Sequence, residues 1–365
     1  SDVENDQGGA LRILWGKSIN DIEFGNIAHY GIRRLLDNGE IDEIAQVPAF
    51  QEDQYQFVSN TINDSTSLGL GIERFIITAH TTEPWIYYSS VPDSGYSVDN
   101  IIPLPPDGLF ASKMNNEIEI TWNSSIDSDF DYYKVSTIDG NEYYTLQNEF
   151  IDNSEYSYNE YIINTIDINE NISLNSDIIS INDLHMGANL VSFNVLPSAS
   201  DPENVIGGVA YGAISEGNAT VNIGDAWVGS LTEFNACEGY WVFIDADISH
   251  TIIGSSVDCE YALHEGSNLK SFPCNGEVQT SSAINNECIS GLIGEGAAGI
   301  NIEGNWFGSL QSLQPGDAYW ITSDCDIPSF QFNCSEPELT RAINNSHSKF
   351  PEGMSYAQSS SQGFY

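Results

Sequence analysis

The sequences LHMGANLVSF (184–193) and LHEGSNLKSF (263–272) are two copies of one pattern, and they lie 79 residues apart. The same offset relates ISEG (214–217) to IGEG (293–296), WVGSL (227–231) to WFGSL (306–310), and GYW (239–241) to AYW (318–320). Anchors that keep one offset over this length indicate a duplicated segment rather than chance similarity. Each copy has the length of a small domain, and the sequence predicts one at 182–258 and one at 259–335.

Both copies have the pattern of β-structure. After the Gly-x-Asn turn, apolar and polar residues alternate as they do on a strand. A second alternating run starts at each Tyr-Trp pair, in YWVFIDADI (240–248) and YWITSDCDI (319–327). We therefore expect two small β-rich domains with these Tyr and Trp side chains in their cores.

The upstream half contains short apolar runs separated by Asn, Asp, Gly and Ser, which is the pattern of β-sandwiches. Residues 1–102 hold LRILW (11–15), IAHYGIRRLL (27–36), QYQFVS (54–59) and RFIITAHT (74–81). The Gly- and Pro-containing stretch PDSGYSVDNIIPLPP (92–106) predicts a domain boundary. Residues 103–181 form a second such region, with EIEITW (117–122), FDYYKVST (130–137) and YIINTID (161–167) as strands.

The second region resembles the fibronectin type III family. Its Pro-rich start PLPPDGL (103–109), Trp122 on an early strand, the pair Tyr132–Tyr133 and the run YIINTIDINENIS (161–173) follow in that family's order. The resemblance implies a β-sandwich in which Tyr161 is the tyrosine corner that pins one end. Residues 1–102 resemble a more divergent member, with Trp15, Tyr30 and Phe75 in similar places.

The two copies, through G-x-N-L-x-S-F, GEG and W-x-G-S-L, resemble β-modules that accompany such domains in large secreted bacterial surface proteins. The expected fold is therefore all-β. It comprises tandem β-sandwich domains of the fibronectin type III or immunoglobulin-like kind, followed by two duplicated small β-domains.

The composition is strongly acidic, with 53 Asp and Glu against 10 Lys and Arg and a formal net charge of −43. Such a surface repels nucleic acids and anionic membranes, and it attracts divalent cations or a basic partner. Alternatively, the negative charge keeps the protein soluble in a salty medium, where salt screens the repulsion between its carboxylates. No apolar run is long enough for membrane insertion. The chain starts SDVENDQGG, without Met or a signal peptide, as expected of a processed product or a piece of a longer protein.

All six cysteines lie in the repeat region, and none has the C-x-x-C spacing of a zinc or redox site: Cys237, Cys259, Cys274, Cys288, Cys325 and Cys334. An even number in one region predicts disulfides and hence an oxidising, extracellular location, with buried free thiols as the alternative. Because Cys259 and Cys334 flank the second repeat, their positions favour that pair.

Asp127, Asp129 and Asp131, in IDSDFDYY, are the candidate calcium ligands. Alternate carboxylates of a loop can converge on Ca²⁺, although this loop lacks the Gly and Glu positions of an EF-hand. An acidic loop without metal is the alternative. Glu216 and Glu295 recur in equivalent Gly-containing turns, where each would bind a cation or accept a hydrogen bond from a backbone amide.

The sequence carries no H-E-x-x-H, G-x-S-x-G or phosphate-binding motif, which predicts a protein that is not an enzyme. His185 and His264 occupy equivalent positions of the two copies, which indicates a structural role. Aromatic side chains could bind glycans or instead pack against other side chains. The candidates are Tyr87, Tyr88, Tyr143, Tyr144, Trp241 and Trp320.

The C-terminal segment, 336–365, is polar and rich in Ser. It is either a flexible linker or a strand donor that adds MSYAQSSSQGFY (354–365) to a neighbour's open sheet edge, with Met354, Tyr356, Phe364 and Tyr365 as assembly residues.

These patterns together predict a non-enzymatic extracellular structural protein of the cell surface, a filament subunit whose partners are copies of itself or other surface proteins. The alternatives are an adhesive or glycan-binding module array and an accessory part of a larger secreted hydrolase.

Overall fold

The computed structural model describes residues 1–334 except residues 5, 66–68 and 225. The chain forms two compact units. The first comprises residues 1–103, 127–131 and 166–173, and the second comprises 104–126, 132–165 and the chain from 174 onward. Both are built of β-strands, which confirms the all-β class. Among the described residues, no helix is long and apolar enough to cross a membrane.

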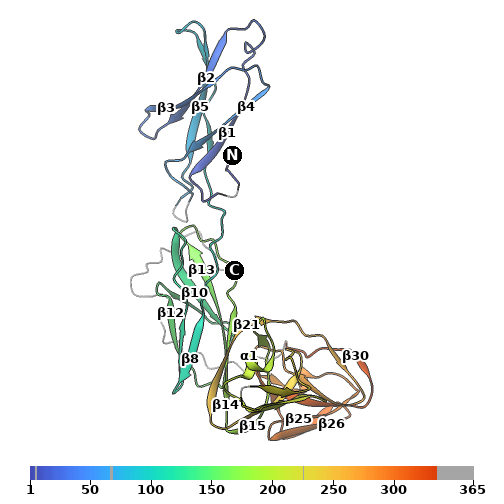
Figure 1. The fold of residues 1–365 in the computed structure, drawn as a ribbon. Helices are drawn as coiled ribbons and strands as arrows, with labels where there is room; N and C mark the ends of the chain where they lie inside the picture. The colour runs from blue at the N-terminus through green and yellow to red at the C-terminus, as the bar shows by residue number, and fades with distance from the viewer. Residues whose placement is uncertain (5, 66–68, 225, 335–365) are drawn as a thin grey trace. The chain divides into compact units, whose positions relative to one another are not determined.

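The first unit is a β-sandwich (Figure 1). One sheet pairs β1 (Ala10–Gly16) with β4 (Gln54–Asn60). The other has the order β3-β2-β5-β6, with β7 also paired to β5; its strands are β2 (Ile27–Leu35), β3 (Ile41–Pro48), β5 (Glu73–Thr81), β6 (Tyr87–Ser89) and β7 (Asp93–Gly95). Their apolar faces meet at Trp15, Tyr30, Ile32, Tyr55 and Ala79.

The second unit begins with another sandwich. A three-stranded sheet has the order β12-β9-β8, made of β8 (Phe110–Met114), β9 (Glu117–Thr121) and β12 (Glu149–Asn153). Trp122, which follows β9, is buried and meets the edge of Tyr133 at 5.1 Å between ring centroids. Tyr161 is buried too, and its hydroxyl donates to Asp152 Oδ2 at 2.8 Å. It therefore links the two sheets through a carboxylate, whereas the hydroxyl of a tyrosine corner bonds to the backbone.

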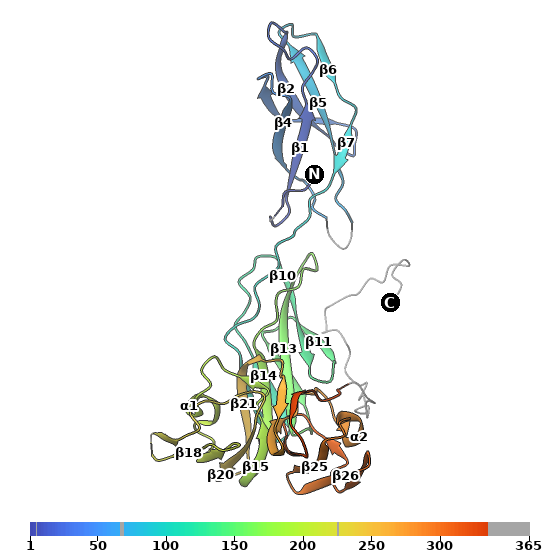
Figure 2. The ribbon, with the colours of Figure 1, turned by 90° about the vertical axis from the view of Figure 1, so that its right-hand side faces the viewer.

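The sheet that faces it has six strands in the order β11-β10-β13-β14-β21-β16. They are β10 (Phe130–Thr137), β11 (Glu142–Thr145), β13 (Tyr158–Asp167), β14 (Ile178–Leu184), β16 (Val195–Leu196) and β21 (Ile248–Ser256). β14 pairs with β13 on one side and with β21 of the first repeat on the other, side by side in Figure 2. The sandwich and the first repeat therefore share one sheet, and β14 crosses the boundary predicted after residue 181.

The two repeats have equivalent sheets. The first has the order β15-β20-β17-β18-β19, from β15 (Gly187–Ser192), β17 (Gly212–Ile214), β18 (Ala219–Asn222), β19 (Trp227–Gly229) and β20 (Gly239–Ile244), with helix α1 (Pro202–Ile206). The second has the order β23-β29-β25-β26-β27, from β23 (Gly266–Ser271), β25 (Ile289–Gly294), β26 (Ala297–Ile302), β27 (Asn305–Gly308) and β29 (Ala318–Ser323), with helix α2 (Thr280–Ala283). Two strand pairs complete it: β22 (Tyr261–Leu263) with β30 (Ile327–Phe330), and β24 (Val278–Gln279) with β28 (Ser312–Leu313).

Neighbouring residues on a strand point to opposite faces, which separates each Tyr from the Trp beside it. Tyr240 and Tyr319 lie in the cores of their repeats, as expected. Trp241 and Trp320 instead lie on the outer faces of the two sheets, beside Leu190 and Leu269. The prediction that these two tryptophans fill the cores is therefore wrong.

All six cysteines form disulfides, Cys237–Cys259, Cys274–Cys334 and Cys288–Cys325. The pairing of Cys259 with Cys334 that their positions favoured is wrong. After β30 the chain returns to α2, where the Asn333 amide donates to the Ala283 carbonyl at 2.9 Å, and this places Cys334 beside Cys274.

Replacing Cys288 and Cys325 together by Ala should lower the free energy of unfolding of the second unit by about 4 kcal/mol. The bond closes a loop with a sequence separation of 37 residues, so its loss frees that loop in the unfolded chain. Urea denaturation followed by tryptophan fluorescence measures the change. A loss below about 1 kcal/mol would contradict a stabilising role for this crosslink.

Candidate functional site

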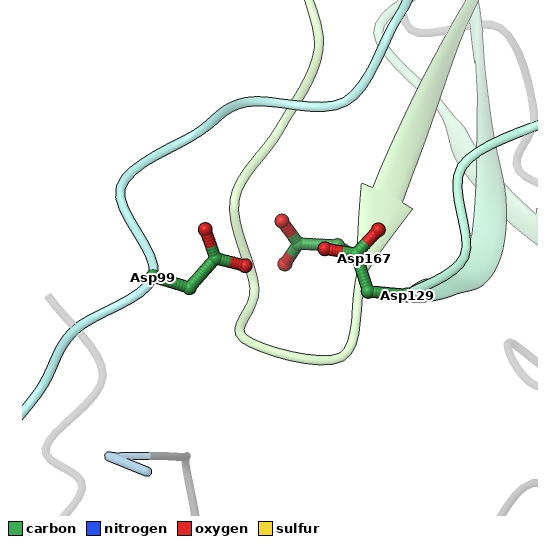
Figure 3. A group of neighbouring side chains, drawn as sticks. All are labelled: Asp99, Asp129 and Asp167. Atoms are coloured by element: carbon green, nitrogen blue, oxygen red, sulfur yellow. The ribbon is translucent and has the colours of Figure 1, made fainter. Parts of the chain in front are cut away.

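Three aspartates from separate parts of the sequence converge in the first unit (Figure 3). Asp167 is the last residue of β13, Asp129 directly precedes β10, and Asp99 follows β7. One carboxylate oxygen of each lies within 4.8 Å of those of the other two. Asp99 and Asp167 are buried and Asp129 is half-buried, so this acidic group is largely shielded from water.

The turn that follows β13 holds the group in place. The Asp167 carboxylate accepts hydrogen bonds from the backbone amides of Asn169 and Asn171, both at 2.9 Å. The Asn169 side chain donates to Asp99 Oδ2 at 2.9 Å, and the Asn171 side chain donates to the Asp99 carbonyl at 3.2 Å. The segment DINEN (167–171) therefore fixes two of the three carboxylates.

The charges of these side chains are poorly compensated by protein groups. Among the described residues, no lysine, arginine or histidine forms an ion pair with Asp99, Asp129 or Asp167. Burial raises the pKa of Asp129, and the nearby charges of Asp99 and Asp167 raise it further. Burial and Asp167 also raise the pKa of Asp131. A proton or a cation would relieve this repulsion.

The donors present suit a calcium ion, which prefers carboxylate and amide oxygens. Besides the three carboxylates, Asn169 Oδ1 is buried and accepts no hydrogen bond. Asn169 also lines a surface pocket together with Asp64, Asp99 and Asp129. The residues that would hold Ca²⁺ are therefore Asp99, Asp129, Asp167 and Asn169.

The candidate ligands named from sequence are only partly brought together. Asp129 belongs to the acidic group, whereas Asp127 and Asp131 are not members of it. Sequence reasoning missed Asp99 and Asp167, because their approach depends on how separate loops fold. The run DINEN was the available indication, since Asp followed by Asn at two and four residues favours a turn closed by its own side chain.

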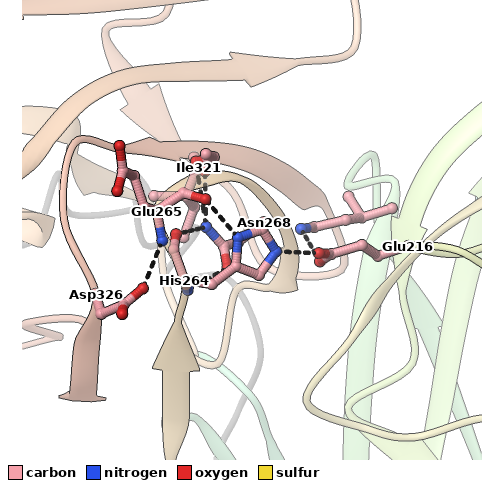
Figure 4. Close-up of polar contacts among 8 residues, drawn as sticks. Glu216, His264, Glu265, Asn268, Ile321 and Asp326 are labelled. Carbon is pink, nitrogen blue, oxygen red and sulfur yellow. Dashed lines mark hydrogen bonds and ion pairs between the residues drawn. The ribbon is translucent and has the colours of Figure 1, made fainter.

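A second polar site links the two repeats (Figure 4). His264 Nε2 lies 2.6 Å from Glu216 Oε1, and the other oxygen of Glu216 accepts a hydrogen bond from the Leu269 amide at 2.9 Å. Asn268, the Asn of the Gly-x-Asn motif, accepts from the His264 amide at 2.8 Å and donates to the His264 carbonyl at 2.9 Å. The motif therefore shapes the turn that presents this histidine.

The same contacts recur with the repeats exchanged. His185 pairs with Glu295, and the other oxygen of Glu295 accepts from the Leu190 amide at 2.7 Å. Asn189 bonds the backbone of His185 at 2.9 and 2.8 Å. Glu216 and Glu295 thus each accept a hydrogen bond from a backbone amide, which was one of the two roles predicted from the sequence. In both cases the amide belongs to the other repeat.

An apolar centre lies between these two polar contacts. Leu190 packs with Leu269 and Ala318, and half-buried Trp241 and Trp320 close over them. Backbone bridges join Val191 to Asp317 and Glu238 to Lys270. Each contact has its counterpart with the repeats exchanged, so the repeats meet as the subunits of an isologous dimer do, within one chain.

The candidate glycan-binding aromatics fall into two classes. Tyr87 and Tyr88, on β6, are exposed. Tyr143 packs against Phe150 at 5.1 Å and Tyr144 against Tyr132 at 5.7 Å, and both are half-buried. With the two repeat tryptophans packed in the interface, the tyrosines of β6 are the candidates that remain accessible.

No protein-family model matches the sequence, and no curated protein matches it. The chain is similar to a solved structure, the FN1–FN3 domains of chicken CNTN1, at 14% identity and a TM-score of 0.23. The match covers 47% of this chain and 62% of that chain, so this chain spans less than two thirds of its length. At that score the match carries no weight, and the β-sandwich assignment rests on the strand pairing of the chain itself.

Replacing Asp129 by Asn should remove a thermal stabilisation by Ca²⁺. The raised pKa of Asp129 means that, without a cation, its contribution to stability is present below about pH 3.8 and is lost as pH rises through the raised value. In EDTA at neutral pH the variant should therefore melt at a higher temperature than the natural chain. At a calcium concentration about 100 times the Kd, binding should raise the free energy of unfolding of the natural chain by about 2.7 kcal/mol and its melting temperature by several degrees. The variant should show neither increase.

Differential scanning calorimetry measures both effects. The matched control is Asp127→Asn, which removes a neighbouring carboxylate outside the acidic group and should leave the calcium response intact. An equal calcium response in all three proteins would rule out this site.

The contacts between the repeats should make the second unit more stable at acidic pH. The Met186 carbonyl and Glu295 raise the pKa of His185, and the Glu265 carbonyl and Glu216 raise that of His264. A raised histidine pKa gives stability that is complete below about pH 6.5 and lost as pH rises through the folded value. The variant His185→Gln/His264→Gln should show a smaller fall in melting temperature between about pH 5.5 and 8.

The counterpart variant, Glu216→Gln/Glu295→Gln, keeps an oxygen for each backbone amide but removes both charges. It should also reduce the pH dependence in a thermal scan, but by less than the histidine variant, because each histidine keeps its contact with the Met186 or Glu265 carbonyl. If the melting temperature of either variant fell with pH as much as that of the natural chain, the histidine–glutamate pairs would not be the cause of the pH dependence.

Proposed function

We propose that this chain is a non-enzymatic extracellular structural protein of the cell surface, a filament subunit that assembles by strand addition. The observation that carries the proposal is the construction of the second unit. The sandwich shares a sheet with the first repeat, the two repeats meet through reciprocal contacts, and three disulfides crosslink the repeat region. Three modules joined in this way suit a structural element, and disulfides favour an oxidising compartment.

The tail supplies the donor in this proposal. Its assembly residues, Met354, Tyr356, Phe364 and Tyr365, lie outside the described residues, as does the whole of 336–365. The alternation in MSYAQSSSQGFY suits an added strand, since main-chain hydrogen bonds hold the strand and alternate side chains fill pockets.

An open sheet edge is available to accept it. In the described part of the chain, β4 pairs with β1 alone, so no strand pairs with its other edge. Its sequence, QYQFVSN, carries no charge, and Val58 is 51% exposed. Uncharged edges of this kind pair readily with another strand. Calcium at Asp99, Asp129 and Asp167 belongs to the same proposal, because it would hold together the loops of the first unit.

Electron microscopy of the native protein, with and without EDTA, tests the proposal. Filaments should form with the full chain and disappear when 336–365 is deleted. Val58→Lys should also abolish them, because a lysine on a sheet edge opposes pairing. The matched control, Val91→Lys, places the same charge at an exposed position outside the strands and should leave filaments unchanged. Unchanged filaments after deletion of the tail would refute strand addition.

An adhesive, glycan-binding role is the second candidate, and the exposure of Tyr87 and Tyr88 favours it. Aromatic rings on a surface offer the flat apolar faces on which sugars stack. A glycan array probed with the natural chain and with Tyr87→Ser/Tyr88→Ser tests it. An array without hits would remove this candidate.

A further inference from the structure

Three loops meet at one end of the first unit and expose large apolar side chains. They are residues 17–26 between β1 and β2, 49–53 between β3 and β4, and 82–86 between β5 and β6. The register brings them together, since His29 lies opposite Pro48, Ile27 opposite Thr81, and Gly16 opposite Gln54. The exposed side chains of this loop end are Ile19, Ile22, Phe24, Phe50, Trp85 and Ile86.

The degree of exposure is unusual for such residues. Phe24 is 97% exposed and Trp85 is 75% exposed. Single exposed apolar residues are common, but a group on neighbouring loops marks an interaction surface. Phe24 also has a φ of +67°, a conformation that costs energy for a bulky side chain and that clusters at binding sites.

One buried carboxylate holds two of these loops. Asp21 Oδ2 accepts hydrogen bonds from the hydroxyls of Tyr30 at 2.9 Å and Tyr55 at 2.7 Å. The Tyr30 hydroxyl accepts from the Ser18 amide at 2.8 Å, and the Tyr55 hydroxyl accepts from the Phe50 amide at 2.6 Å. The first and second loops are therefore fixed to the core through the same side chain.

The third loop is fixed in a different way. The Thr81 hydroxyl accepts from the Glu83 amide at 3.2 Å and lies 2.9 Å from the Ile86 carbonyl, to which it donates. The Thr82 amide donates to the Asn26 carbonyl at 2.9 Å, which ties this loop to the first. Loops held in this way lose little conformational entropy on binding, so their apolar side chains can contribute more fully to affinity.

The charges around the loop end indicate which kind of partner surface would be complementary to it. Each of the three loops carries an exposed glutamate, Glu23, Glu52 or Glu83, and the one lysine of these loops, Lys17, is paired with Asp53 at 2.8 Å. A complementary surface has an apolar centre and a basic rim. A second copy is a poor match, because the chain has only 10 Lys and Arg against 53 Asp and Glu.

We propose that the loop end docks another protein, whose binding surface has an apolar recess bordered by Lys and Arg. This goes beyond the structural role proposed above. It concerns loops that the tail, β4 and the acidic group do not use.

A random-peptide phage library, panned on the full chain, tests the proposal. Enriched peptides should combine aromatic or aliphatic residues with Lys or Arg. Their Kd should rise about tenfold or more for Phe24→Ser and for Trp85→Ser, because central aromatic residues dominate such interfaces. The matched control, Ile126→Ser, removes an 86% exposed apolar side chain in the second unit and should change nothing.

Two further variants test the charge at the loop end and the rigidity of its loops separately. Glu23→Lys/Glu83→Lys should weaken the binding of the same peptides by reversing the rim charge. Tyr55→Phe keeps every exposed apolar side chain but loses the hydroxyl that holds the second loop, and it should weaken binding through loss of preorganisation.

Several outcomes would overturn the proposal. One is that no peptide is enriched, and another is that enriched peptides lack basic residues or bind Phe24→Ser and Trp85→Ser as tightly as the natural chain. Cosedimentation with neutral phosphatidylcholine vesicles, lost in the same variants, would assign the loop end to lipid instead. Hits on a glycan array lost in these variants would assign it to sugar.

Discussion

The second unit depends on two glutamates that reach from one repeat into the other. Each has one oxygen on the backbone amide of the Leu in the other repeat's Leu-x-Ser-Phe segment, and its second oxygen on the other repeat's histidine. A carboxylate that accepts from an amide and an imidazole fixes both distance and direction, which apolar contact alone does not. Leu190, Leu269 and the two tryptophans can then bury their side chains against each other. Without the glutamates, the amides of Leu190 and Leu269 would lose their acceptors within the contact between the repeats.

The two units solve the problem of a small core in different ways. A domain of fewer than 80 residues buries a modest share of its surface, so each repeat needs additional support. The repeats obtain it from three disulfides, from each other and, for the first, from the shared strand β14. The first unit contains no cysteine and relies instead on buried polar networks, such as Asp21 with Tyr30 and Tyr55. The shared strand also explains why the first repeat is not separate from the sandwich before it.

The parts of the fold that follow from local pattern could be predicted, and those that depend on contacts between distant segments could not. Alternation of apolar residues located the strands, and the constant offset located the duplication, because both are properties of neighbouring positions. The sequence contained no indication that β14 has two partners, or that Cys334 returns to Cys274. The face of Trp241 could have been inferred, since Tyr240 beside it must point the other way. One of the three members of the acidic group could be predicted: Asp129 lies in a recognisable acidic run, whereas Asp99 and Asp167 join it only through the folding of separate loops.

Buried carboxylates at opposite ends of the first unit show how neighbours decide what the same chemical group does. Asp21 lies among hydroxyl donors, which satisfy its charge and in turn hold two backbone amides. Its Oδ2 is therefore occupied by structural hydrogen bonds, and a cation at that oxygen would have to displace them. Asp99, Asp129 and Asp167 have amide donors on some oxygens but have one another as nearest charges, and Asn169 Oδ1 beside them is unpartnered. Hydrogen bonds from neutral amides do not cancel the repulsion of three carboxylates within 4.8 Å, so a positive ion bound there would stabilise this end of the unit.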